Sequence, residues 1–580
     1  MKMTGGEIVV RALEDEGIRV AFGIPGTHNI ELYDALAGSS AVRPVLVTDE
    51  QSAGFMADGY WRASGSMACV NLVPGAGLTH ALSGVAEAYM DGVPMLVLGC
   101  GIRRDVRKAF QLHDIDQLAL AAPVTKRTWR PADGAALYPA IREACAVARS
   151  GTPGPVMVEV SVDLYLFRHE VDPSAWTAPP AVPAPAPAAD LVRRAADVLT
   201  AAGGPPLLYA GLGARDATAE LLALAERLSA PVATTIQGKG VFPETHPLFL
   251  WNGFGNAAPP FVRAIAGSCR ATLAIGCRFS EVGTAGYGLT PPGPLVHVDI
   301  NPDVLGRNYP AEVAVASDAG EFLRALLAAL PSPDGRSADA VDSLAGRIRA
   351  GHAAVRTEWL AHRSADRVTP HVLLEALDRR FGPDTVYVTD SGNGTFLAME
   401  GLRLDRPGRF LAPVDYSCMG YSVPAAIGAK LGRPASPVVA LAGDGAFLMT
   451  GLELLTAASL GVPVAVFVLR DRELAQIAQF QATAFNRRTA SALPDYHLGG
   501  LAEGIGVEWL ALDRDDQVEG VLAEARAIVA AGRPVLIDTA IDYSEKTWFT
   551  RGVVKTMLGR LPWPDRLRFV ARALGRKLSR

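Results

Sequence analysis

The chain has 580 residues, which at roughly 150 residues per domain is enough for three or four domains. It carries 55 Lys and Arg against 60 Asp and Glu, a net charge of −5, and 49% of its residues are apolar. This composition excludes a disordered or fibrous chain, and the lack of a basic excess argues against binding to nucleic acid. The six cysteines form no C-x-x-C pair, and no apolar run is long enough to cross a membrane. We therefore expect a cytoplasmic protein with free thiols.

Two breaks divide the chain. Residues 172–190 contain six prolines, which favour a stiff, extended linker, and residues 331–338 form a weaker break before a helical stretch. The expected segments are an N-terminal domain over 1–171, a linker over 172–190, a central domain over 191–330, a linker and helix over 331–365, a C-terminal domain over 366–545 and a basic tail over 546–580.

Each of the three expected domains alternates short apolar, β-rich runs with helical patterns. The strand candidates are residues 19–24, 43–48, 67–73 and 94–100, then 205–211, 231–235, 271–276 and 294–300, and finally 385–390, 437–443, 463–469 and 533–539. Strands that alternate with helices favour doubly wound parallel sheets. The sequence therefore predicts an α/β fold with three such domains in a row.

A Gly-Asp-Gly turn follows an apolar strand in the third domain. Gly443, Asp444 and Gly445 close that strand, a helix is expected over 447–460, and the next strand ends just before Asp471. Because crossovers between parallel strands are right-handed, both carboxylates reach the same edge of the sheet. Such a pair suits Mg²⁺, and the glycines let a diphosphate approach the backbone. Taken alone, Gly-Asp-Gly is more often an ordinary turn, and it is the second aspartate that favours a site.

This spacing resembles the thiamin-diphosphate motif, in which GDG is followed one β-α-β unit later by Asn-Asn or Asn-Asp. The chain departs from the motif at Arg470, which stands in place of the first Asn. The resemblance implies that Asp444 and Asp471 hold Mg²⁺ by their side chains. It implies that Glu473 holds the metal by its main-chain carbonyl.

The stretch from Ser417 to Ala429 is similar to the GTMGFGLPAAIGA segment of the same enzymes. The resemblance implies that Met419 wedges thiamin diphosphate into its bent conformation, and that the Ser417 carbonyl receives the aminopyrimidine amine. A core methionine is the alternative for Met419. The other cofactor contacts that the resemblance implies are Gly26, Gly77, Asn393, Gly443, Gly445 and Ala446.

Glu50 begins a stretch similar to the family segment HEQ-A-A-x-x-A-A-D-G-Y-A-R. A glutamate at a helix start is most often a partner of the helix dipole. The resemblance implies a catalytic role instead: Glu50 would bind N1′ of the aminopyrimidine and promote removal of the thiazolium C2 proton. The histidine that usually precedes it is Asp49 here.

Three polar residues of the first domain are candidates for the substrate side of the site. The segment from Phe110 to Asp114 resembles the family's FQE segment, and His28 follows the first strand-to-helix turn. Gln111, His28 and His113 could orient a 2-oxo acid carboxylate or relay protons. Gln111 is the strongest of the three, because the resemblance implies a glutamine there against the reacting carbonyl. A lone histidine is more often structural.

The resemblance covers about residues 4–545 and is closest to the acetolactate synthase family. It implies a carboligase that decarboxylates a 2-oxo acid and couples the enamine to a second 2-oxo acid or carbonyl. It also implies a homodimer or homotetramer, with Glu50 of one chain facing the diphosphate site of another. The alternatives are an aldehyde-releasing decarboxylase and a thiamin-dependent oxidase. Flavin adenine dinucleotide (FAD) is not favoured, because the turn at Gly211-Leu-Gly213 lacks a third glycine.

The residues after the metal motif bear on substrate size. The stretch 473–481 aligns with the acetolactate synthase stretch E-Q-G-M-V-x-Q-W-Q, so Gln476, Ile477 and Phe480 are the expected substrate pocket. Phe480 replaces a larger Trp, which favours a bulky or aromatic 2-oxo acid. This stretch and the tail segment 546–556 resemble the acetolactate synthase homologue of scytonemin biosynthesis, which joins two aromatic 2-oxo acids.

The tail over 546–580 has ten Lys or Arg and one acidic residue. One helical face carries Leu567, Val570, Ala571, Leu574 and Leu578. We expect a helix that packs on the subunit. A membrane-surface helix or a lid over the active site is the alternative.

Overall fold

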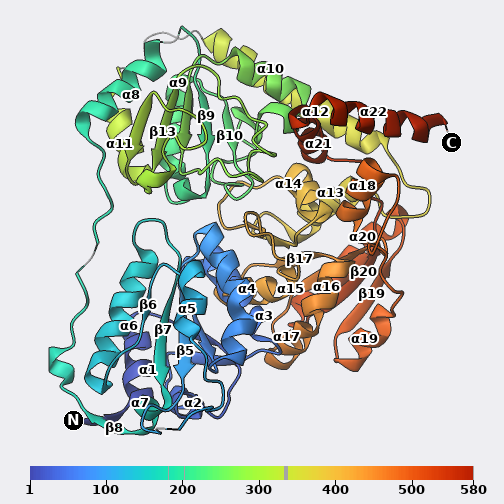
Figure 1. Cartoon of the computed structure of the whole chain (residues 1–580). Helices are drawn as coiled ribbons and strands as arrows, with labels where there is room; N and C mark the ends of the chain where they lie inside the picture. The colour runs from blue at the N-terminus through green and yellow to red at the C-terminus, as the bar shows by residue number, and fades with distance from the viewer. Residues whose placement is uncertain (107, 181, 202, 332–337, 579–580) are drawn as a thin grey trace.

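The computed structural model describes residues 1–106, 108–180, 182–201, 203–331 and 338–578, without the side chains of 338–341, 570 and 573–578. It contains three six-stranded sheets, and every strand pairing within them is parallel. Helices cover both faces of each sheet (Figure 1). The predicted class, three doubly wound α/β domains, is therefore confirmed.

The N-terminal sheet has the order β3-β2-β4-β5-β7-β6. Its strands are β2 (Val20–Gly23), β3 (Arg43–Leu46), β4 (Cys69–Leu72), β5 (Met95–Gly101), β6 (Thr128–Trp129) and β7 (Pro155–Ser161). The helices are α1 (Gly5–Asp15), α2 (Ile30–Ala37), α3 (Glu50–Ser64), α4 (Ala76–Asp91), α5 (Gln117–Ala121), α6 (Gly134–Arg149) and α7 (Val162–Leu166). Two short strands, β1 (Lys2–Thr4) and β8 (Arg168–Glu170), pair antiparallel beside this domain.

The central sheet has the order β11-β10-β9-β12-β13-β14. Its strands are β9 (Leu207–Ala210), β10 (Val232–Thr234), β11 (Phe249–Asn252), β12 (Thr272–Ile275), β13 (Leu295–Asp299) and β14 (Val313–Ala316). Its helices are α8 (Ala189–Ala201), α9 (Thr218–Leu228), α10 (Pro260–Ser268) and α11 (Ala319–Ala329). The proline-rich segment that leads to α8 runs along one side of the molecule (Figure 1).

The C-terminal sheet has the order β16-β15-β17-β18-β20-β19. Its strands are β15 (Val386–Thr389), β16 (Phe410–Leu411), β17 (Val438–Gly443), β18 (Ala465–Arg470), β19 (Glu508–Leu512) and β20 (Val535–Ala540). The helices from residue 338 onward are α12 (Ala338–Ala361), α13 (Pro370–Phe381), α14 (Asn393–Gly401), α15 (Ser422–Gly432), α16 (Asp444–Thr450), α17 (Leu454–Leu460), α18 (Ala475–Phe485), α19 (Leu498–Gly504), α20 (Val518–Ala530), α21 (Trp548–Arg560) and α22 (Trp563–Leu578).

The prediction of a single helix over 447–460 is wrong, because the structure breaks this segment. It is divided into α16, a 3₁₀ turn over Gly451–Glu453, and α17. Thr450 leaves the helical conformation with a φ of −136°, and its hydroxyl donates to the Gly420 carbonyl at 2.6 Å. The break therefore ties α16 to the loop that precedes α15.

Helices α3 and α15 join the first domain to the third (Figure 1). A Cβ at Gly59 would lie 2.1 Å from the Ala425 carbonyl oxygen, and one at Gly428 would lie 2.0 Å from the Met56 carbonyl oxygen. Only glycine permits this close approach of two helix backbones. The packing fixes the N-terminal domain against the loop that enters α15.

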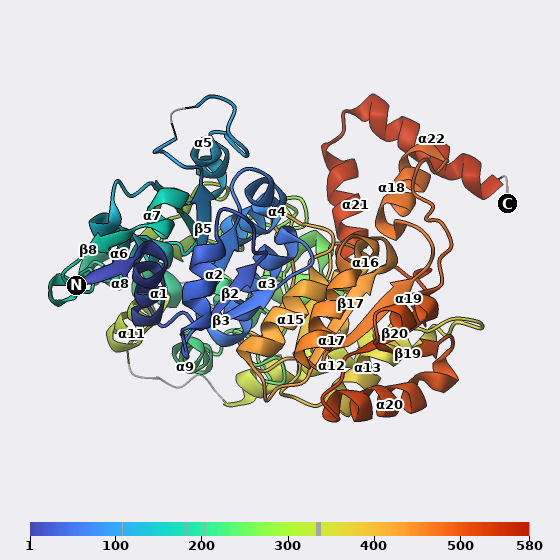
Figure 2. The same ribbon diagram turned by 90° about the horizontal axis from the view of Figure 1, so that it is seen from below.

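Helices α21 and α22 project from the C-terminal domain (Figure 2). Helix α22 contacts α18: the Arg572 guanidinium donates to the Ala484 carbonyl at 2.7 Å, and the Asn486 side chain donates to the Arg572 carbonyl at 3.4 Å. These contacts hold α22 against α18, but Leu567 and Ala571 of the expected apolar face are exposed, so the packing of that face stays a prediction. The side chains of Val570, Leu574 and Leu578 lie outside the described ones. No helix in the described ranges is both long and apolar enough to cross a membrane.

Candidate active site

Asp444 and Asp471 lie together at the carboxyl edge of the third sheet, where β17 and β18 end side by side. The Asp444 side chain is 2% exposed. One of its oxygens accepts the backbone N–H groups of Asp471 at 3.2 Å and Arg472 at 2.7 Å, and the other accepts that of Gly445 at 2.8 Å. The turn after β18 is thus folded onto the Asp444 carboxylate, as the strand pattern predicts.

The charges in this pocket suit a cation. Burial and the neighbouring carboxylates of Asp444 and Glu473 raise the pKa of Asp471 to about 7. A divalent cation between Asp444 and Asp471 would relieve that repulsion. The Glu473 side chain forms a salt bridge with Arg488 at 2.6 Å. Its main-chain carbonyl is therefore the group of Glu473 that could bind the metal. The described residues contain no cluster of three or more His, Cys, Asp or Glu side chains placed to hold a metal, so carbonyl and cofactor oxygens would complete the shell.

Most of the expected cofactor contacts of the third domain line this same pocket. They are Asn393, Met419, Gly443, Gly445 and Ala446, together with Asp444, Asp471, Glu473, Gln476 and Ile477. A Cβ at Gly443 would meet no atom within 4 Å, so the strand end lies open to a ligand. The cavity has a volume of about 110 Å³, whereas sites for whole cofactors have volumes of about 300–1,000 Å³. A second cavity of about 700 Å³ adjoins it and shares Asp471, Glu473 and Tyr543 with it.

Asp390 organises the cofactor loops, and the sequence analysis missed it. The side chain is buried and accepts the backbone N–H groups of Ser391, Gly420 and Ser422 at 2.8–2.9 Å. Ser417 does not line the pocket, and its hydroxyl lies 2.8 Å from that of Ser391. An available signal was that Asp390 closes β15 just as Asp444 closes β17.

Glu50 begins α3 in the N-terminal domain and is not among the residues that line the pocket. Its side chain is 11% exposed, and one carboxylate oxygen lies 3.3 Å from His80 Nδ1. A Cβ at Gly77 would lie 3.1 Å from the other oxygen, so Gly77 and Glu50 share one small site. Asp49 caps α3 by accepting the N–H of Gln51 at 2.7 Å.

Glu453 was also missed, and it ties the turn before Glu50 to the third domain. One of its carboxylate oxygens accepts the N–H and hydroxyl of Thr48 and the N–H of Asp49. The side chain is 1% exposed. No local sequence pattern predicts this contact, because more than 400 residues separate the partners.

The remaining candidates of the first domain form a separate group on loops. The rings of His28 and His113 lie 5.3 Å apart, and burial together with the charge of His113 lowers the pKa of His28. Gln111 donates to the Val106 carbonyl at 3.2 Å. A Cβ at Gly26 would strike the Val73 side chain. The pocket beside Asp444 is lined by residues 390–543, so within one chain these four residues are not part of it.

The substrate-pocket candidates are divided. Gln476 and Ile477 line the pocket from the first turn of α18. Phe480 is half-buried one turn further along the same helix and does not line it. Tyr543, which follows β20, lines the pocket and was not predicted.

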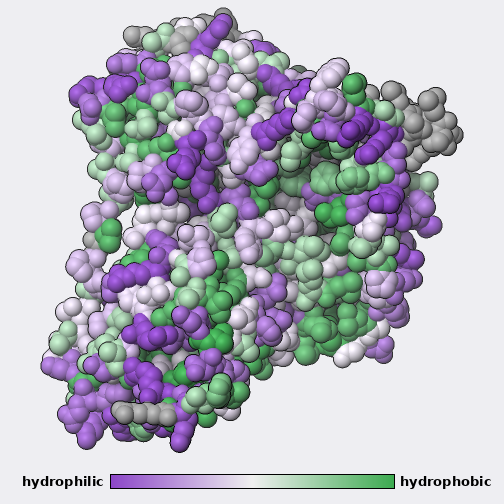
Figure 3. Space-filling model, in the orientation of Figure 1, coloured by the Kyte–Doolittle hydropathy of each residue, from purple (hydrophilic) through white to green (hydrophobic). Residues whose placement is uncertain are grey.

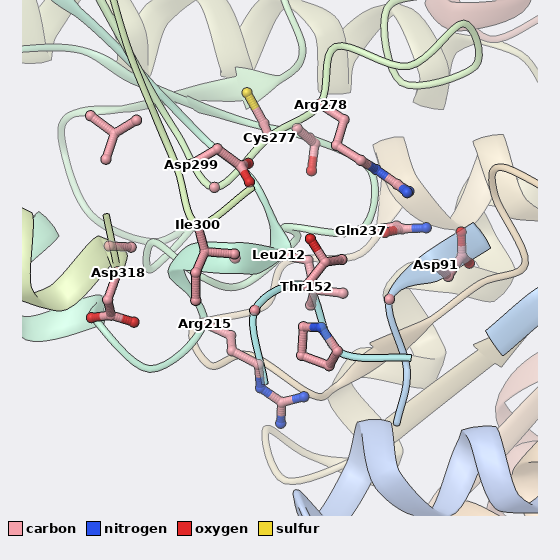
Figure 4. Close-up of a pocket in the computed structure, with 18 of the residues that line it drawn as sticks. Asp91, Thr152, Leu212, Arg215, Gln237, Cys277, Arg278, Asp299, Ile300 and Asp318 are labelled. Carbon is pink, nitrogen blue, oxygen red and sulfur yellow. The ribbon is translucent and has the colours of Figure 1, made fainter. Parts of the chain in front are cut away.

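A larger cavity of about 400 Å³ lies between the three domains (Figure 4). Asp299, Asp318 and Arg215 border it, and Arg278 donates to Asp415 of the third domain at 2.6 Å. A Cβ at Gly211 would lie 2.2 Å from the Gly276 carbonyl oxygen, so tight packing between two turns explains this glycine. It is therefore no evidence of a phosphate-binding turn.

The fold and the carboxylate-lined pocket define a cofactor-dependent α/β enzyme. The thiamine pyrophosphate (thiamin diphosphate) enzyme family matches the chain in three parts. These are the N-terminal TPP binding domain over residues 3–120, the central domain over 192–326 and the C-terminal TPP binding domain over 390–539. The chain belongs to this family, and it is an acetolactate synthase-like enzyme that depends on thiamin diphosphate.

Similar proteins extend along almost the whole chain. The acetolactate synthase large subunit of Corynebacterium glutamicum is 31% identical over 567 residues, which is 94% of this chain and 88% of that protein. The probable acetolactate synthase large subunit of Methanocaldococcus jannaschii is 31% identical over 560 residues, 94% and 93% of the two chains. A probable 2-ketoarginine decarboxylase of Pseudomonas aeruginosa is 35% identical over 515 residues, 87% and 89% of the two chains. The specific likeness to the scytonemin homologue is not among these findings.

Proposed function

We propose that the protein is a carboligase that decarboxylates one 2-oxo acid and joins the remaining acyl unit to a second 2-oxo acid or carbonyl. The chemistry that thiamin diphosphate supplies when bound is stabilisation of a carbanion at the reacting carbon. The observation that carries the proposal is the position of Gln476 and Ile477. They line the pocket of Asp444 and Asp471, and we propose that an acceptor meets the acyl unit beside them.

The proposed roles are those that the resemblance to the thiamin-diphosphate enzymes implies. Asp444 and Asp471 hold Mg²⁺ by their carboxylates and Glu473 by its carbonyl. Met419 supports the cofactor from its own loop, and the Ser417 carbonyl receives the aminopyrimidine amine. Glu50 exchanges a proton with N1′ of the aminopyrimidine, and Gln111, His28 and His113 face the substrate from the first domain.

We further propose that the active site forms between two chains of a homodimer or homotetramer. Within one chain, Glu50 is not among the residues that line the pocket of Asp444 and Asp471. The exposed hydrophobic side chains of Leu448, Met449, Leu452 and Leu455, on and between α16 and α17, are 46–57% exposed. Figure 3 shows hydrophobic residues gathered on this face, and such a patch favours a second copy as its cover.

The acceptor is proposed to be bulky or aromatic, like those that the scytonemin homologue joins. Phe480 follows Gln476 by one helical turn, so the two side chains lie on the same face of α18. We expect Phe480→Trp to lower kcat/KM for phenylpyruvate as acceptor about tenfold relative to pyruvate, because a larger ring takes up acceptor space. Phe485→Trp, at the exposed end of the same helix, is the matched control. If Phe480→Trp and the wild type have the same ratio of kcat/KM for phenylpyruvate and pyruvate, Phe480 does not shape the acceptor pocket.

An aldehyde-releasing decarboxylase is the second candidate function. The observation in its favour is the 35% identity to a protein named as a probable 2-ketoarginine decarboxylase. The two functions differ in what becomes of the acyl unit. A carboligase consumes a second carbonyl compound for each CO₂ released, and a decarboxylase releases free aldehyde without an acceptor. Measuring CO₂, aldehyde and acceptor in one reaction separates them.

A further inference from the structure

One face of helix α4 lies along the segment that leads to Met419. Ser83, Glu87 and Asp91 are spaced four residues apart and therefore share this face. The Cys418 thiol lies 3.5 Å from the Ser83 carbonyl oxygen, and the Cys418 backbone N–H donates to Glu87 at 2.9 Å. Asp91 accepts the N–H groups of residues 414 and 415 at 3.4 and 3.3 Å. The first domain thus holds residues 414–418 of the third domain in the same chain.

This segment needs support because its backbone is strained. Ser417 has a φ of +64°, in the left-handed region that residues other than glycine seldom adopt. On the other side of the loop, Asp390 accepts the N–H groups of Gly420 and Ser422. Met419 lies between these two anchors and lines the pocket.

We propose that Glu87 is a positioning residue: its hydrogen bond to the Cys418 N–H holds the Ser417–Gly420 loop so that Met419 supports thiamin diphosphate. This inference rests on the proposed function of Met419. Glu87 is fully buried, and one of its carboxyl oxygens accepts the Cys418 N–H. Without Glu87 the partly buried Cys418 N–H, next to the pocket residue Met419, would lose this acceptor.

The surroundings of Glu87 indicate that it holds the loop by the oxygen that accepts the Cys418 N–H, and that this role needs no negative charge. Burial and the neighbouring Asp91 raise the pKa of Glu87 well above its usual range. The buried Arg62 guanidinium donates to Asp58 and Asp91, so the positive charge at this site is already matched. A glutamine at position 87 would keep an oxygen for Cys418 and carry no charge.

The test is the dissociation constant of thiamin diphosphate, measured by calorimetry in saturating Mg²⁺ on the full chain. We expect Glu87→Ala to weaken binding about tenfold, the order expected when a partly buried N–H loses its acceptor. Glu87→Gln should bind within about twofold of the wild type, because its amide oxygen replaces the carboxyl oxygen. Glu16→Ala, which removes another buried carboxylate of the same domain, should leave the constant unchanged.

Two results would overturn the inference about Glu87: wild-type affinity in Glu87→Ala, or equal weakening in Glu87→Gln and Glu87→Ala. If Glu87→Ala does not fold, Glu87→Met replaces it, because methionine fills similar space without accepting the hydrogen bond. A wild-type chain that binds no thiamin diphosphate would overturn the cofactor assignment itself, and the inference with it. Wild-type binding that is lost in Asp471→Ala but kept in Glu87→Ala would overturn the Glu87 inference alone.

Discussion

Replacing Glu50 by Gln is expected to lower kcat by about a hundredfold to ten-thousandfold, the range lost when a positioned acid–base group is removed. An amide cannot exchange a proton with the aminopyrimidine, although it fills the same space between Gly77 and His80. The dissociation constant for thiamin diphosphate should change much less than kcat. Steady-state kinetics and calorimetry on the same preparation measure both.

The control for this variant is Glu170→Gln, an exposed glutamate in the same domain whose side chain is 83% exposed. It should retain wild-type kcat. A Glu50→Gln enzyme with a kcat within about threefold of the wild type would fall outside the expected range and would remove Glu50 from the catalytic role.

Replacing Asp471 by Ala is expected to weaken Mg²⁺-dependent binding of thiamin diphosphate at least about a hundredfold, since even groups behind a metal ligand contribute ten- to a hundredfold. Without metal, Asp471 is a strained carboxylate beside Asp444, with a pKa raised to about 7. The Tm of the cofactor-free variant should therefore not fall. The rise in Tm that Mg²⁺ and thiamin diphosphate give the wild type should disappear.

Asp495→Asn is the matched control, because Asp495 is exposed beside Arg470 and Arg472 and does not line the pocket. It should keep the full rise in Tm. If Mg²⁺ and thiamin diphosphate raise the Tm of Asp471→Ala as much as that of the wild type, Asp471 does not bind the metal.

The same two variants test the arrangement of the subunits. If each site combines Glu50 of one chain with Asp471 of its partner, a mixed dimer of Glu50→Gln and Asp471→Ala chains contains one intact site. Random exchange of equal amounts should restore about a quarter of wild-type activity. Recovery no greater than the sum of the separate activities would place both residues in a site within one chain.

Much of the fold could be predicted from the sequence, because buried parallel strands are continuous apolar runs. Residues 437–443 and 463–469 contain β17 and most of β18. The meeting of Asp444 and Asp471 follows from right-handed crossover alone. Short strands such as β6 and β16, with two residues each, lack a run long enough to recognise.

The contacts between domains could not be predicted from local patterns. Glu453 binds the turn before Glu50, and Glu87 binds Cys418, across several hundred residues of sequence. In the sequence both appear as ordinary polar residues of helical segments. The break at Thr450 depends on the Gly420 carbonyl, which is equally remote. Alignment with a family stretch placed Phe480 in the substrate pocket, yet within one chain it lies outside the pocket lining.

The most direct test of the central claim is the product of the wild-type enzyme with thiamin diphosphate and Mg²⁺. Pyruvate, phenylpyruvate and indole-pyruvate would be supplied singly and in pairs, with one partner of each pair labelled with ¹³C. We expect a coupled product whose mass is the sum of two 2-oxo acids less one CO₂, with the label identifying donor and acceptor. Free aldehyde as the sole product, with the acceptor unconsumed, would contradict it and make the protein a decarboxylase.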